Sequence, residues 1–128
     1  MSFYIAKALQ VPFDAAIEKL TVALNKEGFG ILTGIDVRET LKRKLGIDWR
    51  PYHILGACNP PLARQALEAE DKIGTMLPCN VIVQDLGDGR VEVAAIDPVG
   101  TMERIGNPKL TELARSVWSK LSAVISRL

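Results

Sequence analysis

The chain has 128 residues, of which 48% are hydrophobic and 24% charged, and its formal net charge is +1. This balance favours a single folded domain, residues 1–128, and argues against a disordered chain. A nearly neutral charge provides no overall field for nucleic acid or for an anionic membrane surface, so we expect neither as a partner. No apolar run reaches the roughly 18 residues that a membrane-spanning helix needs.

The cysteine content and the N-terminal residues indicate the cellular compartment of the protein. Two cysteines are too few for a disulfide scaffold. The N-terminal residues lack the charged and then apolar layout of a signal peptide. We therefore expect a cytoplasmic protein with free thiols.

The N-terminal part predicts a strand followed by an amphipathic helix. Residues 2–9 alternate weakly between polar and apolar side chains, which favours an edge strand. Apolar residues then recur at helical spacing after Pro12, and Gly28 is the expected left-handed stop. The apolar stripe of this helix consists of Phe13, Ile17, Leu20 and Leu24.

A second strand and a short helix follow. Residues 29–35 alternate as a strand and place Gly30 and Gly34 on one face, which we interpret as a bend rather than a close approach by another group. Asp36 and Glu39 then have the spacing of a capping box, which predicts the start of a short helix.

Residues 52–62 predict a buried strand that runs directly into a helix. Asn59 is a favourable N-cap, because its side-chain oxygen can accept a hydrogen bond from a first-turn N–H group. Pro60 suits the first helical position, where its missing N–H group costs nothing. We expect this helix to end at Gly74 and to direct four apolar side chains inward: Leu62, Ala66, Leu67 and Ile73.

The C-terminal part predicts a hairpin and a long helix. Residues 80–86 and 90–96 are β-branched runs joined by a glycine-rich turn, and Pro98 ends the pairing. Asn107 and a following proline repeat the helix start seen at Asn59. In the last helix we expect four residues to be buried against the sheet: Leu113, Val117, Leu121 and Val124.

This order of elements predicts an α+β domain with helices on one face of a largely antiparallel sheet. Seven segments carry a resemblance to a known family: residues 27–30, 36–37, 40–42, 45–46, 52–63, 77–83 and 95–98. They resemble the family catalogued as domain of unknown function 302. The resemblance implies a TATA-binding-protein-like fold, β-α-β-β-β-β-α, with an antiparallel sheet of about five strands, a long C-terminal helix and here two short inserted helices. It implies no activity.

The unusual chemistry of the chain lies in two Cys-Asn pairs at strand ends. We take these pairs, together with Asp97, as a candidate ligand-binding locus: Cys58, Asn59, Cys79, Asn80 and Asp97. We assign no catalytic residue. His53 and Cys58 have an odd separation along a strand and fall on opposite faces, which disfavours a Cys–His pair. Two cysteines and one histidine do not complete a zinc site, so we expect no metal and no cofactor.

Two opposing effects act on the thiol at the strand–helix junction. The positive end of the following helix dipole favours the Cys58 thiolate, whereas burial raises a thiol pKa. Gly56 and Ala57 are small, and we expect them to leave space beside the sulfur. We therefore expect Cys58 to be accessible and Cys79 to line the same recess.

Three functions are compatible with these features. The first is a non-enzymatic domain, homodimeric, that binds a small or amphipathic molecule between the sheet and the long helix. The second is a thiol-dependent enzyme or redox sensor that uses Cys58 and Cys79. The third is a purely structural homo-oligomeric protein. A pocket lined by both Cys-Asn pairs favours the first two, and a flat apolar sheet face favours the third.

Overall fold

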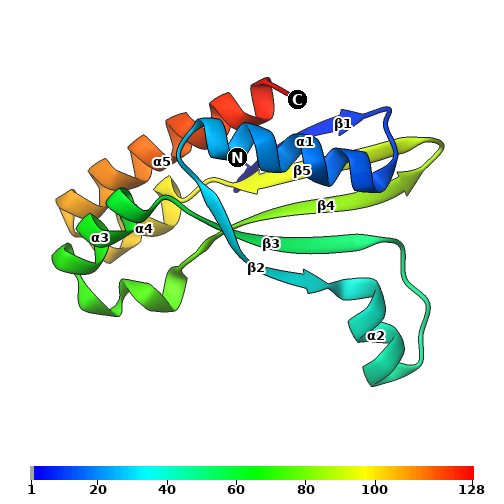
Figure 1. The fold of residues 1–128 in the computed structure, drawn as a ribbon. Coiled ribbons are helices and arrows are strands. Elements are labelled where there is room, and N and C mark those ends of the chain that lie inside the picture. Colours follow the sequence, from blue (N-terminus) through cyan, green and yellow to red (C-terminus); the bar gives the residue numbers. More distant parts are fainter. Residues whose placement is uncertain (1) are drawn as a thin grey trace.

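A computed structural model describes residues 2–128 and shows a five-stranded antiparallel sheet in the order β1-β5-β4-β3-β2 (Figure 1). The strands are β1 (Tyr4–Leu9), β2 (Gly30–Asp36), β3 (Tyr52–Cys58), β4 (Cys79–Gly87) and β5 (Arg90–Ile96). The predicted α+β class and antiparallel sheet are confirmed, and β1 lies at an edge as expected. The β4–β5 hairpin turns through residues in the left-handed region, including Asp88 at φ 55°.

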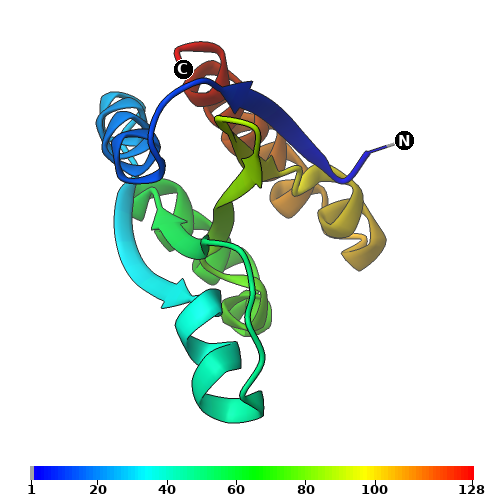
Figure 2. The ribbon, with the colours of Figure 1, turned by 90° about the vertical axis from the view of Figure 1, so that its right-hand side faces the viewer.

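The helices are α1 (Phe13–Lys26), α2 (Val37–Leu45), α3 (Pro60–Ala69), α4 (Val99–Ile105) and α5 (Pro108–Ser126), with a 3₁₀ helix, η1 (Asp71–Met76). Helices α1 and α5 lie over the same face of the sheet (Figure 1), and α2 projects away from the rest of the molecule (Figure 2). Within residues 2–128, no helix combines the length and apolarity that crossing a membrane requires.

One helix end and one additional helix differ from the sequence-based expectation. The helix expected to reach Gly74 ends at Ala69, because Glu70 is extended (φ −155°) and its carboxylate accepts a hydrogen bond from the N–H group of Lys72, which starts η1. Helix α4 was not predicted from the sequence. It begins where Asp97 accepts a hydrogen bond from the N–H group of Val99, at a site that the sequence marked only as the end of a strand.

The hydrophobic core is divided into two clusters that α5 joins. The first lies between the sheet and the helices α1 and α5, and its fully buried members include Leu20, Leu24, Val81, Val83, Val93, Leu121 and Val124. The second lies beyond the end of the sheet, where the first turns of α5 pack against α3, η1 and α4. Its members are Ala66, Ile73, Met102, Leu110, Leu113 and Ala114.

Burial along α5 therefore follows the prediction only in part. Leu121 and Val124 are buried against the sheet, as expected. Leu113 is buried too, but in the second cluster rather than against the sheet. Val117 packs against the first cluster as expected, but it is only half-buried and also lines the cavity described below.

The bend expected in β2 coincides with an irregularity in its pairing. The register with β3 shifts between Ile31 and Thr33, and Leu32 at the shift is 67% exposed. A Cβ atom at Gly30 would meet nothing within 4 Å, so no group approaches closely there.

The close approach occurs at Gly56 of β3 instead. A Cβ atom at this position would lie 2.6 Å from Cγ of Pro78 and would also overlap the hydroxyl of Thr33. The expectation that Gly56 leaves free space beside Cys58 is therefore wrong, since residues from the two neighbouring segments fill that space.

We expect Gly56→Ala to destabilise the protein by about 1–3 kcal/mol, the usual cost of forcing an extra group into a packed site. The matched control is Gly30→Ala in the neighbouring strand, where a Cβ atom has room. We expect the control to lose no stability, because its backbone φ is negative and its surroundings are open. Urea melts of the two variants measure the difference. Equal stability of Gly56→Ala and wild type would contradict the packing described here.

Candidate functional site

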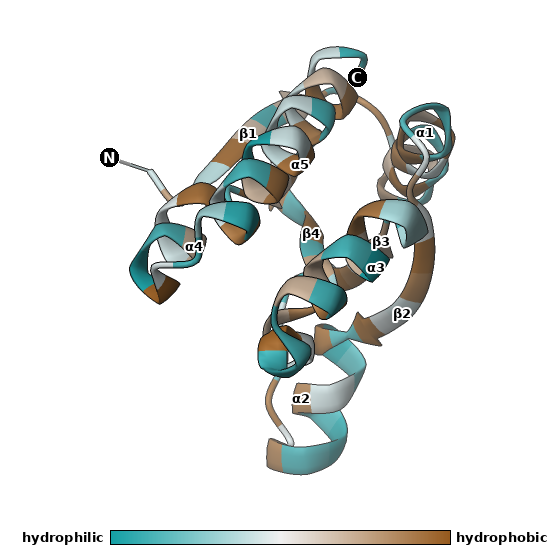
Figure 3. Cartoon of the chain, turned by 90° about the vertical axis from the view of Figure 1, so that its left-hand side faces the viewer, coloured by the Kyte–Doolittle hydropathy of each residue, from teal (hydrophilic) through white to brown (hydrophobic). Residues whose placement is uncertain are grey.

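A cavity of about 280 Å³ lies between α3 and α5, at the end of the sheet where β3 ends and β4 begins. Figure 3 views the molecule from this side, with α4 and α5 on one hand and α3 on the other. Phe29, Ala57 and Cys79 border it at the sheet, and Met102 of α4 borders it on the far side. The cavity lies between the two hydrophobic clusters, at the place where α5 passes from one to the other.

Small side chains account for the open space. Ala57 of β3, Ala63 and Ala66 of α3 and Ala114 of α5 all line the cavity. Three of them, Ala57, Ala66 and Ala114, are buried, so larger side chains at these positions would occupy the space directly. From the sequence, we expected a ligand to bind between the sheet and the long helix. The cavity borders both the sheet, at Ala57 and Cys79, and α5, and α3 forms a further wall that the sequence did not indicate.

The structure brings together three of the five candidate site residues. Cys58, Asn59 and Cys79 all line the cavity. Asn80 does not, because it follows Cys79 in a strand and belongs to a hollow on the opposite, uncovered face of the sheet. Asp97 also lies elsewhere. Its carboxylate accepts a hydrogen bond from the N–H group of Val99 (3.0 Å) at the start of α4.

Asn59 has a structural role at the start of α3. Its Oδ1 accepts a hydrogen bond from the N–H group of Leu62 (3.3 Å), which confirms the predicted cap. Its Nδ2 donates to the backbone carbonyl of Glu27 (3.3 Å), just after α1. Both ends of the amide therefore have partners within the protein.

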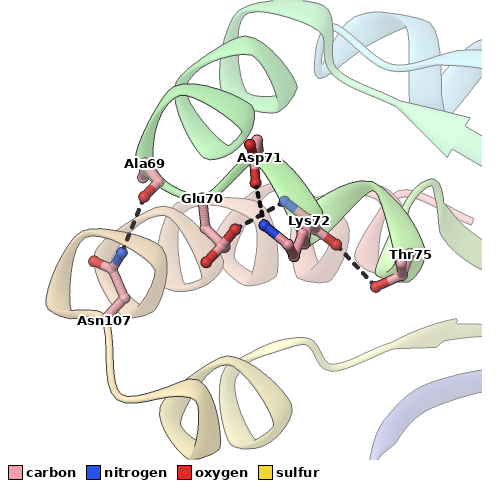
Figure 4. Close-up of polar contacts among 6 residues, drawn as sticks. All are labelled: Ala69, Glu70, Asp71, Lys72, Thr75 and Asn107. Atoms are coloured by element: carbon pink, nitrogen blue, oxygen red, sulfur yellow. Dashed lines mark hydrogen bonds and ion pairs between the residues drawn. The ribbon is translucent and has the colours of Figure 1, made fainter.

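Asn107 has the same double role at the start of α5. Its Oδ1 accepts a hydrogen bond from the N–H group of Lys109 (3.0 Å), and its Nδ2 donates to the carbonyl of Ala69 (3.2 Å), the last residue of α3 (Figure 4). Figure 4 also shows Glu70, which bonds to the N–H group of Lys72 where η1 begins. The C-terminal end of α3 is thereby attached to the N-terminal end of α5.

The two cysteines are free thiols, both half-buried. Burial, and to a lesser extent the neighbouring Cys58, raises the pKa of the Cys79 thiol from its ordinary value of 9.0 to about 11. At neutral pH Cys79 is therefore a protonated thiol, which is neither a nucleophile nor a good metal ligand.

The histidine is engaged on the helix-covered side of the sheet. The His53 ring packs edge-on against Phe13 of α1, with 5.1 Å between ring centroids. Its Nε2 lies 3.6 Å from Oδ2 of Asp36. Cys58 lies elsewhere and lines the cavity between α3 and α5. Among the side chains of residues 2–128, no group of three or more His, Cys, Asp or Glu is placed to hold a metal ion.

Sequence reasoning missed the residues at the rim of the cavity. Leu32 and Leu67 both border it and are 67% and 44% exposed. Leu67 was expected to point inward on its helix, but it lies at the surface. A leucine at helical spacing gives no signal that distinguishes a rim position from a core position.

A second hollow, of about 400 Å³, lies on the uncovered face of the sheet. Its lining comes from strand residues and from Phe3, and the larger apolar members are Phe3, Tyr4, Tyr52, Ile82 and Ile96. Phe3 is 73% exposed. This face is the side of the sheet opposite to α1 and α5 (Figure 1).

Comparisons with known proteins agree with the resemblance found in the sequence. Residues 5–128 match the model of the family described as "Domain of unknown function DUF302". Among solved structures, the chain is similar to an uncharacterized conserved DUF302 protein from Bacillus stearothermophilus. The two are 30% identical, with a TM-score of 0.90, over 99% of this chain and 98% of the other. No curated protein matches.

The raised pKa of Cys79 predicts slow alkylation in the folded protein. Below a pKa, the thiolate fraction falls tenfold for each pH unit, so a rise from 9.0 to about 11 lowers it about a hundredfold. At pH 8 we expect iodoacetamide to modify Cys79 in folded Cys58→Ala up to about a hundred times more slowly than in the same variant unfolded in urea, because the variant keeps the burial, which is the larger cause, and loses only the smaller contribution of Cys58. The rate in the folded variant should still rise with pH above pH 9. The reciprocal variant Cys79→Ala serves as the control that reports on Cys58 alone. Equal rates in the folded and unfolded chain would contradict burial of this thiol.

Proposed function

The chain belongs to the DUF302 family, and we propose that it is a non-enzymatic protein that binds a small or amphipathic molecule in the cavity between α3 and α5. The observation that carries the proposal is the cavity itself. It measures about 280 Å³, and apolar side chains from the sheet and from three helices line it. Ligand pockets are typically concave, apolar and largely pre-formed.

The energetics of the cavity support a bound molecule. The cavity is lined by apolar side chains and opens to the surface past the exposed residues Leu32 and Leu67. Each Å² of apolar ligand surface that it removes from water contributes roughly 25 cal/mol to binding.

Thiol chemistry receives less support than binding. A thiol-dependent enzyme or redox sensor would use Cys58 and Cys79, and both do line the cavity. However, burial raises the pKa of Cys79 to about 11, which keeps this thiol protonated. The only histidine packs against Phe13 of α1 and does not line the cavity. The two free thiols fit a reducing compartment, and we propose the cytoplasm.

The binding proposal predicts stabilisation by a small apolar probe. We expect naphthalene to raise the unfolding temperature of the wild-type protein, because a ligand that binds only the folded state stabilises it. Ala114→Phe should abolish this shift by filling the cavity. The matched control, Ser116→Phe, is exposed on the same helix and should retain it. A wild-type protein that shows no shift, or an Ala114→Phe variant that shows the full shift, would contradict the proposal.

We also propose that the protein self-associates through the uncovered face of the sheet. The accessible surface is 7628 Å² for a chain of 14.0 kDa. A compact monomer of this mass exposes about 6,700 Å². The excess of about 900 Å² shows that the chain exposes an extended surface for its mass. The projecting helix α2, which has no buried residues, contributes to this excess.

The composition of the uncovered face supports a second copy as the partner. Phe3, Tyr4 and Tyr52 line its hollow, and aromatic residues are enriched at interfaces. Two copies of the protein could bury this face against each other about a two-fold axis. A two-fold dimer is the commonest form of homo-oligomer.

The expected result is a homodimer, twice 14.0 kDa, in sedimentation at micromolar concentration. Ile82→Glu should give a folded monomer, because it places a charge in the proposed interface. The matched control, Val22→Glu, changes an exposed apolar residue of α1 and should remain dimeric. The interface is wrong if Ile82→Glu stays dimeric, and self-association is wrong if the wild type sediments as a monomer.

A further inference from the structure

Among residues 2–128, no charged side chain lines the α3–α5 cavity. Its polar side chains are the thiols of Cys58 and Cys79 and the Asn59 amide, whose oxygen accepts a hydrogen bond from Leu62 N–H and whose nitrogen donates to the Glu27 carbonyl. An ionised group inside the cavity would therefore lose its water without gaining a partner. Such burial is strongly unfavourable unless the charge is paired.

The volume limits the size of the molecule. A dry apolar cavity of about 150 Å³ in a protein core holds benzene, which has six non-hydrogen atoms. In proportion, the cavity of about 280 Å³ accommodates about eleven non-hydrogen atoms. This corresponds to a two-ring compound or to a chain of about ten carbons.

The mouth of the cavity offers no unbalanced charge either. A shallower hollow on the outer side of α3 shares Cys58, Ala63 and Leu67 with the cavity. This hollow also contains Arg64 and Glu68, and the Nε atom of Arg64 lies 2.9 Å from Oε1 of Glu68. The Glu68 carboxylate thus already pairs with Arg64, and an anionic head group would have to displace it.

From these three features we infer that the ligand is an uncharged, largely apolar molecule of about eleven non-hydrogen atoms. It enters past the exposed leucines Leu32 and Leu67 and fills the space between the alanines of α3 and α5. This inference rests on the proposed binding function and names the chemical class of molecule that the cavity takes.

Three probes of equal chain length test the class: decan-1-ol, decanoate and decylammonium. Binding of each to the full-length protein is measured by calorimetry at pH 8, where the acid and the amine are ionised, below their micelle-forming concentrations. We expect decan-1-ol to bind at least tenfold more tightly than either ion. Ala114→Phe should weaken its binding at least tenfold, and Ser116→Phe should leave it unchanged. If Ala114→Phe does not fold, Ala66→Leu fills the cavity from the α3 side.

The outcomes separate this inference from the binding function. Decanoate binding as tightly as decan-1-ol would overturn the uncharged class but leave a binding function in place. In that case Arg64→Ala shows whether the arginine holds the head group, since it should weaken decanoate alone. Binding of naphthalene but of none of the three decyl compounds would support an uncharged, apolar ligand, with two rings in place of a ten-carbon chain. Failure of all four compounds would overturn the binding function itself. If the Arg64→Ala variant still binds decan-1-ol more tightly than decanoate and decylammonium, the inference is supported.

Discussion

The arrangement of this protein depends on two asparagine side chains that fix the ends of α3. Asn59 caps the start of α3 and also binds the carbonyl of Glu27, while Asn107 caps the start of α5 and binds the carbonyl of Ala69 at the end of α3. Gly28 leaves room for the contact between Asn59 and Glu27, because a Cβ atom at Gly28 would lie only 3.1 Å from Nδ2 of Asn59. Each hydrogen bond contributes only about 0.5–1.5 kcal/mol. Asn107 thus joins the end of α3 to the start of α5, whereas Asn59 joins the start of α3 to the end of α1. With both ends of α3 fixed in this way, the cavity lies between α3 and α5.

Helix α5 connects this local arrangement to the rest of the fold. Its later turns place Leu121 and Val124 in the first cluster, between the sheet and the helices. Its first turns place Leu110 in the second cluster, beyond the end of the sheet. Between them, Val117 lines the cavity. A helix of 19 residues is long enough to serve both clusters. The cavity is therefore a consequence of one helix packing against two separate groups of residues, with small side chains where they meet.

The sequence allowed the elements to be predicted better than their contacts. Local signals sufficed for the caps at Asn59 and Asn107 and for the β4–β5 hairpin, because each depends on neighbouring residues. The close approach at Gly56 involves Thr33 and Pro78, which are distant in sequence, so no local pattern could reveal it. Cavity formation likewise depends on where α3 stands relative to α5. Among the candidate site residues, alternation along β4 would have separated Asn80 from Cys79, since consecutive strand residues face opposite sides.

A crystal structure of the protein under xenon pressure tests most directly whether a dry apolar cavity lies between α3 and α5. Xenon occupies apolar cavities that exclude water. We predict xenon between Ala66 and Ala114, beside Cys79, with no ordered water in the same space. A cavity filled by hydrogen-bonded waters, or closed by movement of α3 against α5 so that no xenon enters, would contradict this account of the site.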